Sequence, residues 1–160
     1  MTDELYSIAC HEAGHAVAAY VRGGSVDSMT IKPDGDHLGL TVTTLENASD
    51  RSFAIYAGLW AETRLVWPLP TLEGECYGRT FEDCIELARL TNPYGDGELY
   101  VQSLAFEEYE GGLFVRDARE WTWNEELENY WPAIKAVADI LLRDSTATHA
   151  DIKSAVEGSV

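Results

Sequence analysis

The sequence SIACHEAGHAVAAYV, residues 7–21, places two imidazoles and a carboxylate in a run of small apolar residues. Asp3 and Glu4 favour the positive end of a helix, and Gly23-Gly24 is a typical helix stop, which predicts a helix over about residues 3–22. Residues four apart share one helix face, so the two histidines project together. Three polar groups without partners would be costly to bury, which favours a bound metal over a purely structural role.

His11 and His15 have the spacing at which two imidazoles on one helix can bind a single zinc ion. Glu12 lies at the edge of the same face, where its carboxylate can reach a water on the metal. Zinc lowers the pKa of such a water from 15.7 to about 7, and the carboxylate then takes its proton. The motif therefore predicts one zinc ion per chain, with Glu12 as the general base of a metallopeptidase.

Composition restricts the other classes of function. The chain has 160 residues, which suits one domain, and 11 basic against 28 acidic residues give a net charge of −17. Nucleic acid is therefore excluded as an expected partner, because phosphate binding needs clustered basic groups. We expect no membrane contact, since the most apolar segment, residues 53–69, is short and contains Glu62 and Arg64. Three cysteines and an acidic start without a signal sequence favour the cytoplasm.

The remaining pattern predicts an α+β fold that is mainly α-helical and zincin-like, with a small β-hairpin after the motif helix. Residues 26–32 and 38–45 alternate around the turn PDGDH, which is typical of a hairpin. We expect helices over 51–67 and 80–91, shorter helical pieces over 99–110, and helix over 121–144, where Pro132 either kinks it or starts a new helix. Thr148-x-x-Asp151 predicts a further helix start.

A catalytic zinc site usually has three protein ligands, so a third must come from elsewhere in the chain. Asp83 is one candidate, but Thr80-x-x-Asp83 is also a capping pattern in which the carboxylate would serve the helix start. Glu62 is either a direct ligand or an acceptor that orients a histidine N–H. The candidates from the residues alone are Glu62, Glu82, Asp83, His37, His149 and the cysteines Cys10, Cys76 and Cys84.

Four segments, ACHEAGHAVAAYV, MTIKPDGDHLGLT, YAGLWAE and DCIELA, resemble the peptidase domain of the FtsH family of ATP-dependent zinc proteases over about residues 7–91. The resemblance implies that His11, His15 and Asp83 bind zinc and that Glu12 is the base. This sequence differs in having Leu59 for the family's arginine and Glu82 for its asparagine. Gly78 also lies one residue further from Asp83 than the family pattern has its glycine from the ligand aspartate. This shift makes Glu82 a rival ligand. Because the ATPase module and membrane helices of that family are missing, we expect ATP-independent activity.

The hairpin strand that contains Leu38, Gly39, Leu40 and Thr41 is expected to pair with an extended substrate beside the motif helix. We expect one domain over 1–160, with a metal-site core in 1–91 and a helical C-terminal part in 92–160. The predicted function is a zinc metalloendopeptidase that hydrolyses peptides or unstructured protein segments. The alternatives are a catalytically silent or partner-dependent zinc-binding regulatory module, and an ImmA-like peptidase that cleaves a repressor. Because FtsH-type peptidases are hexameric, a homo-oligomer is also expected.

Overall fold

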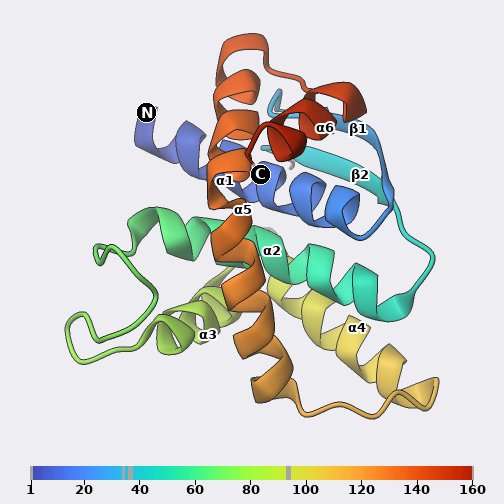
Figure 1. Cartoon of the computed structure of the whole chain (residues 1–160), viewed down its shortest axis with the longest axis vertical. Coiled ribbons are helices and arrows are strands. Elements are labelled where there is room, and N and C mark those ends of the chain that lie inside the picture. Colours follow the sequence, from blue (N-terminus) through green and yellow to red (C-terminus); the bar gives the residue numbers. More distant parts are fainter. Residues whose placement is uncertain (1, 34, 36–37, 93–94, 160) are drawn as a thin grey trace.

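The computed structural model describes residues 2–33, 35, 38–92 and 95–159 of the chain. The described residues form mainly helices, with one two-stranded antiparallel sheet at one side of the molecule, which confirms the predicted α+β, mainly α-helical class (Figure 1). In chain order the elements are α1 (Thr2–Val21), β1 (Ser25–Thr30), β2 (Leu40–Thr44), α2 (Ala48–Val66), α3 (Phe81–Thr91), α4 (Asp96–Tyr109), α5 (Arg116–Asp144) and α6 (His149–Glu157).

The centre of the molecule is the contact between α1 and α2, which lie side by side in Figure 1. The motif helix is lined with alanines that are fully buried, among them Ala9, Ala13 and Ala16. A side chain at Gly14 would collide with the backbone carbonyl of Ala57 on α2. The small residues of the motif helix therefore let the two helix backbones approach closely.

The hairpin follows the motif helix directly, as predicted. Strand β1 pairs antiparallel with β2, and a register shift between Val26 and Ser28 marks a bulge. Within the described residues β2 pairs with β1 alone, so its other edge has no strand partner. The inward residues of β2, Thr41 and Thr43, alternate with exposed ones. The hairpin thereby places a strand with one free edge beside α1.

Helices α3 and α4 pack against one another and against α2 (Figure 1). The prediction of shorter helical pieces over 99–110 is wrong, because α4 is one continuous helix of 14 residues that begins at Asp96. Its buried residues Tyr100 and Glu107 lie seven apart and hence on one face. The Glu107 carboxylate accepts hydrogen bonds from Ser52 on α2 and from Arg119 on α5, which fixes the far end of the helix.

The long helix α5 crosses α1 and α2 in Figure 1 and contains Pro132 in its interior. Helix α5 continues through Pro132, so the proline does not start a separate helix. Trp131, next to it, packs edge-on against Trp60 of α2, with ring centroids 5.8 Å apart. The capping box predicted at Thr148 and Asp151 is present at the start of α6. Among the described residues, no helix has the length and apolarity that a membrane crossing requires.

Candidate metal centre

Helix α1 presents His11 and His15 on one face, as their spacing predicted. Their Nε2 atoms lie 3.0 Å apart, and the two rings meet edge to face with centroids separated by 4.6 Å. His11 is 2% exposed, whereas His15 is half-buried at the edge of a cleft. The motif helix thus places two Nε2 atoms, one from each histidine, at the boundary between core and solvent.

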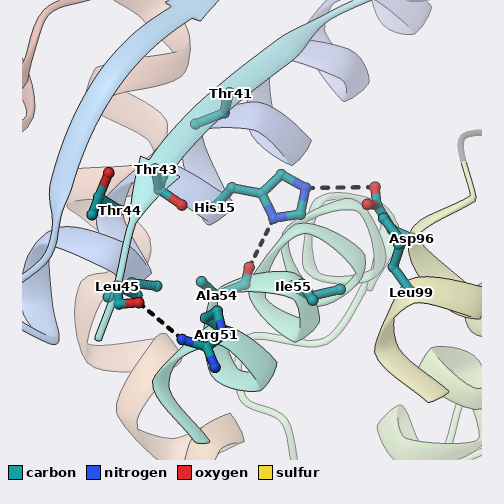
Figure 2. A pocket seen from close by; sticks show the side chains of 10 residues that line it. All are labelled: His15, Thr41, Thr43, Thr44, Leu45, Arg51, Ala54, Ile55, Asp96 and Leu99. Atoms are coloured by element: carbon teal, nitrogen blue, oxygen red, sulfur yellow. Dashed lines mark hydrogen bonds and ion pairs between the residues drawn. The ribbon is translucent and has the colours of Figure 1, made fainter. Parts of the chain in front are cut away.

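Both imidazoles are oriented by contacts of their Nδ1 atoms, the ring nitrogens that face away from the cluster. The Nδ1–H of His15 donates to the carbonyl oxygen of Ala54 on α2 at 2.8 Å, which Figure 2 shows. Gly58, one turn further along α2, leaves room for the His15 ring, because a side chain there would collide with it. The Nδ1 of His11 lies 3.1 Å from Oε2 of Glu62. With protons on both Nδ1 atoms, each Nε2 carries a lone pair directed at the same point.

The third group at this point is Asp96, from the first turn of α4. Its Oδ2 lies 2.6 Å from Nε2 of His11 and 3.5 Å from Nε2 of His15. The backbone N–H of Asp96 donates to Oδ1 of Asn92 at 2.9 Å, which holds the start of the helix. A side chain at Gly97 would collide with the carbonyl of Arg89, so α4 begins tightly against the end of α3. The packing of α4 on α3 therefore positions this carboxylate.

These three donor atoms fit a zinc ion by their chemistry and spacing. In the described part of the chain, His11, His15 and Asp96 form a group whose ligand atoms lie within 4.8 Å of one another. Ligands of a tetrahedral zinc ion with bonds of about 2.0 to 2.1 Å lie about 3.3 Å apart, close to the spacing seen here. Two nitrogen lone pairs and a carboxylate oxygen that face one another repel unless a cation or protons lie between them. Two histidines and one carboxylate also form a common catalytic zinc set.

Without a metal ion, the carboxylates of Asp96 and Glu62 strongly favour the protonated form of His11. Burial lowers the pKa of His11, but the contacts with Asp96 and Glu62 outweigh it and raise the pKa to about 10. Burial likewise raises the pKa of Asp96, and its hydrogen bonds with the two histidines outweigh that effect and hold it well below its usual range. The cluster is thus built to hold positive charge.

Metal uptake should release a proton from His11. A ligand nitrogen must be unprotonated, and with a pKa of about 10 His11 carries its proton at pH 7.5. Zinc binding at pH 7.5 is therefore expected to release at least one proton per ion, and affinity should fall about tenfold for each pH unit below 10. Calorimetric titrations in two buffers of different ionisation enthalpy measure this number. Binding with no proton release would contradict the ligand role of His11.

Glu12 lies next to the cluster on α1 and is held by the hairpin. The hydroxyl of Thr41 donates to Glu12 Oε2 at 2.5 Å, and the Glu12 side chain is nearly buried. A side chain on Gly39 would come within 2.8 Å of Glu12 Oε1, so glycine leaves space for this carboxylate. Leu38 and Leu40 flank Gly39, and Leu40 begins β2. The predicted base and the predicted substrate strand are therefore in direct contact.

The structure does not bring Asp83 to the histidines. Its carboxylate accepts a hydrogen bond from the backbone N–H of Thr80 at 3.0 Å, and its own N–H donates to the Thr80 hydroxyl. This is the capping box that the sequence offered as the alternative, and the carboxylate is engaged at the start of α3. Glu82, its rival, is exposed in the same turn. Glu62 contacts His11 through Nδ1 rather than Nε2, as an orienting acceptor would.

The other candidate ligands also lie apart from the cluster. His149 begins α6 and accepts a hydrogen bond from the backbone of Val26. Burial raises the pKa of the Cys10 thiol to about 12, so this side chain is a neutral core group. Cys76 and Cys84 line a different cavity, beside Trp67. His37 lies outside the described residues.

Asp96 is the member of this candidate metal cluster that the sequence did not predict. It stands in the segment NPYGDGE, where glycines and a proline indicate a turn, and it belongs to the part beyond residue 91. The cluster therefore joins the two parts of the chain that the sequence separates. One signal was available: Gly95-Asp96-Gly97 places an aspartate at a helix start, where its carboxylate can point out of the helix end.

A cleft of about 440 Å³ opens beside the cluster (Figure 2). His15 and Asp96 lie at one part of its wall, and Thr41 and Thr43 of β2 form another. Ile55 of α2 and Leu99 of α4 add apolar surface across from the strand. The cleft is thus bordered by the free-edged strand, by two ligand candidates and by apolar side chains.

Comparison with known proteins supports a peptidase relationship for the N-terminal part. Residues 4–62 match the model of the family described as Peptidase M50B-like. No curated protein matches the chain. The match takes in α1, the hairpin and most of α2, and so includes His11, Glu12, His15 and Glu62 but not Asp96. The segment that carries the histidine pair is therefore similar to a metallopeptidase family.

Proposed function

We propose that this protein is a zinc-dependent metalloendopeptidase that hydrolyses peptides or unstructured protein segments without ATP. The observation that carries the proposal is the convergence of His11 Nε2, His15 Nε2 and Asp96 Oδ2 on one point, with Glu12 between the two histidines on the same helix. The similarity of residues 4–62 to a peptidase family supports the same chemistry. Asp96 takes the ligand role that the resemblance to FtsH assigns to Asp83.

The chain's own residues divide the work of hydrolysis. His11, His15 and Asp96 would hold the zinc ion, which supplies the Lewis acidity that acidifies water and polarises a peptide carbonyl. Glu12 accepts the proton of the attacking water at its carboxylate and passes it to the amine leaving group. The Thr41 hydroxyl donates to Oε2 and so keeps the carboxylate in one orientation. Glu62 and the Ala54 carbonyl fix the two imidazoles.

The substrate would lie extended along the cleft, paired with the free edge of the strand that begins at Leu40. Main-chain pairing of this kind binds many sequences, because it uses groups that every peptide has. It also requires an unfolded or extended segment, which is why we propose peptides and unstructured proteins as partners. We also propose a cytoplasmic location, which the three cysteines favour, and a homo-oligomer, which the resemblance to FtsH over residues 7–91 favours.

Metal analysis and chelation test the proposed activity. The purified protein is expected to contain one zinc ion per chain and to digest an unfolded protein such as reduced casein. Removing the metal with phenanthroline should reduce cleavage to background, and adding zinc back should restore it. A protein that binds zinc but cuts no unfolded substrate would instead indicate the regulatory zinc-binding module. A protein that neither contains nor binds zinc would contradict both functions.

A further inference from the structure

The cleft beside His15 and Asp96 is also lined by a positively charged side chain that has no part in the proposed hydrolysis. Arg51, in the first turns of α2, lines the same cavity as His15 and Asp96. Figure 2 shows its side chain at the end of β2 away from Thr41, where Nη1 donates to the carbonyl oxygen of Leu45 at 3.0 Å. A second bond from Nη1 to the Glu46 carbonyl fixes the guanidinium. The side chain is thus held in place by backbone oxygens, which leave its positive charge uncompensated.

This lack of a carboxylate partner is unusual in so acidic a chain. Among the described residues, six arginines pair with a carboxylate: Arg22, Arg64, Arg89, Arg116, Arg119 and Arg143. In the same part of the chain, Arg51 and Arg79 have no such partner. Arg79 is exposed beside a different cavity, so Arg51 is the arginine that brings unpaired charge to the cleft. Its remaining donors, Nε and Nη2, suit a carboxylate.

The distance between Arg51 and the cluster can be expressed as a number of residues of an extended peptide. Strand β2 and the residue after it run along the cleft from Thr41, which holds Glu12, to Leu45, which anchors Arg51. Four residues of a strand span about 13 Å. A peptide that lies along this strand with its scissile bond near Glu12 therefore places a residue three or four positions away next to the guanidinium.

We propose that Arg51 binds a carboxylate of the substrate, three or four residues from the scissile bond, and so gives the enzyme a preference for acidic peptides. This inference rests on the proposed peptidase function and adds a substrate class to it. The carboxylate belongs either to an Asp or Glu side chain or to the C-terminus of the peptide. An exposed charge pair of this kind changes affinity by about fivefold and weakens in salt.

Binding and cleavage of a defined peptide set test the preference. The probes are fluorescein-labelled decapeptides of neutral sequence that carry one Glu at successive positions, each made with a free and with an amidated C-terminus. Fluorescence anisotropy with the zinc-loaded Glu12→Gln protein measures binding without turnover, and the wild-type protein measures cleavage. Arg51→Glu reverses the charge, Arg51→Lys retains it, and Arg79→Glu makes the same change in net charge outside the cleft.

The expected result is about fivefold tighter binding and faster cleavage when Glu occupies one position three or four residues from the cut site. Arg51→Glu should invert this into a preference for Lys there, while Arg51→Lys and Arg79→Glu retain the preference for Glu. If only amidation of the C-terminus removes the effect, the terminal carboxylate is the ligand. Equal binding and cleavage of neutral and acidic peptides would overturn the role of Arg51 and leave the peptidase intact. Cleavage of no peptide, with zinc bound, would count against the peptidase itself.

Discussion

Replacing Glu12 by Gln is expected to reduce peptide hydrolysis by at least about 100-fold while leaving zinc bound. General base catalysis contributes about 10² to 10⁴ in rate, and an amide cannot take the proton of the attacking water. Glutamine matches glutamate in shape, and its amide oxygen can still accept the Thr41 hydrogen bond that the carboxylate accepts now. The three ligand candidates are other residues, so their geometry should be unchanged. Steady-state cleavage of a quenched fluorescent peptide, with zinc measured on the same samples, gives both numbers.

Glu4→Gln is the matched control for this variant. Glu4 lies on the same helix, is exposed, and gives the same change in charge and side-chain chemistry. Its activity should equal that of the wild type. If Glu12→Gln retained most of the activity with zinc bound, Glu12 would not be the base. If it lost zinc as well, the loss of activity would be a consequence of a disturbed metal site.

Local sequence signals predicted the fold well where a few neighbouring residues decide the conformation. The stop at Gly23-Gly24 and the Thr80 cap each act within one turn, and the first, second and third helices begin and end close to their predicted bounds. The errors concern residues whose state depends on distant packing. The last turns of α4 are anchored by Glu107, which binds Arg119 and Ser52, partners that no pattern within residues 99–110 reveals.

The candidate site divides in the same way. His11, Glu12 and His15 lie on one helix, so spacing alone places the two histidines together. The third ligand candidate, a carboxylate, comes from a residue 85 positions after His11, and its place depends on the packing of α3 against α4 at Gly97. The resemblance favoured Asp83, yet the capping pattern around Thr80 is a strictly local interaction and is the one that forms. The contact of Glu62 with His11 agrees with the orienting role that the sequence left open.

Single alanine replacements of Asp96 and Asp83 should have different effects: the first should lower zinc affinity and the second should lower stability. Asp96→Ala removes the oxygen that lies 2.6 Å from His11 Nε2 and is expected to weaken zinc binding by at least about 100-fold, since loss of an outer-shell partner alone costs 10- to 100-fold. Asp83→Ala removes half of a capping box and is expected to lower the free energy of unfolding by about 1 kcal/mol with zinc binding unchanged. Competition with a zinc-binding dye measures affinity, and urea unfolding measures stability.

Glu82→Ala is the matched control, because this exposed carboxylate lies in the same turn as Asp83 and takes no part in its capping box. It should leave both zinc affinity and stability close to wild type. The opposite pattern, in which Asp83→Ala loses zinc and Asp96→Ala keeps it, would restore the ligand set that the FtsH resemblance implies. It would also mean that α3 must unwind its first turn to release the carboxylate from Thr80, because one oxygen pair cannot serve the helix start and the metal in this arrangement. Loss of zinc in Asp96→Ala alone would instead establish that the metal joins α1 to α4, and that residues beyond 91 complete the site.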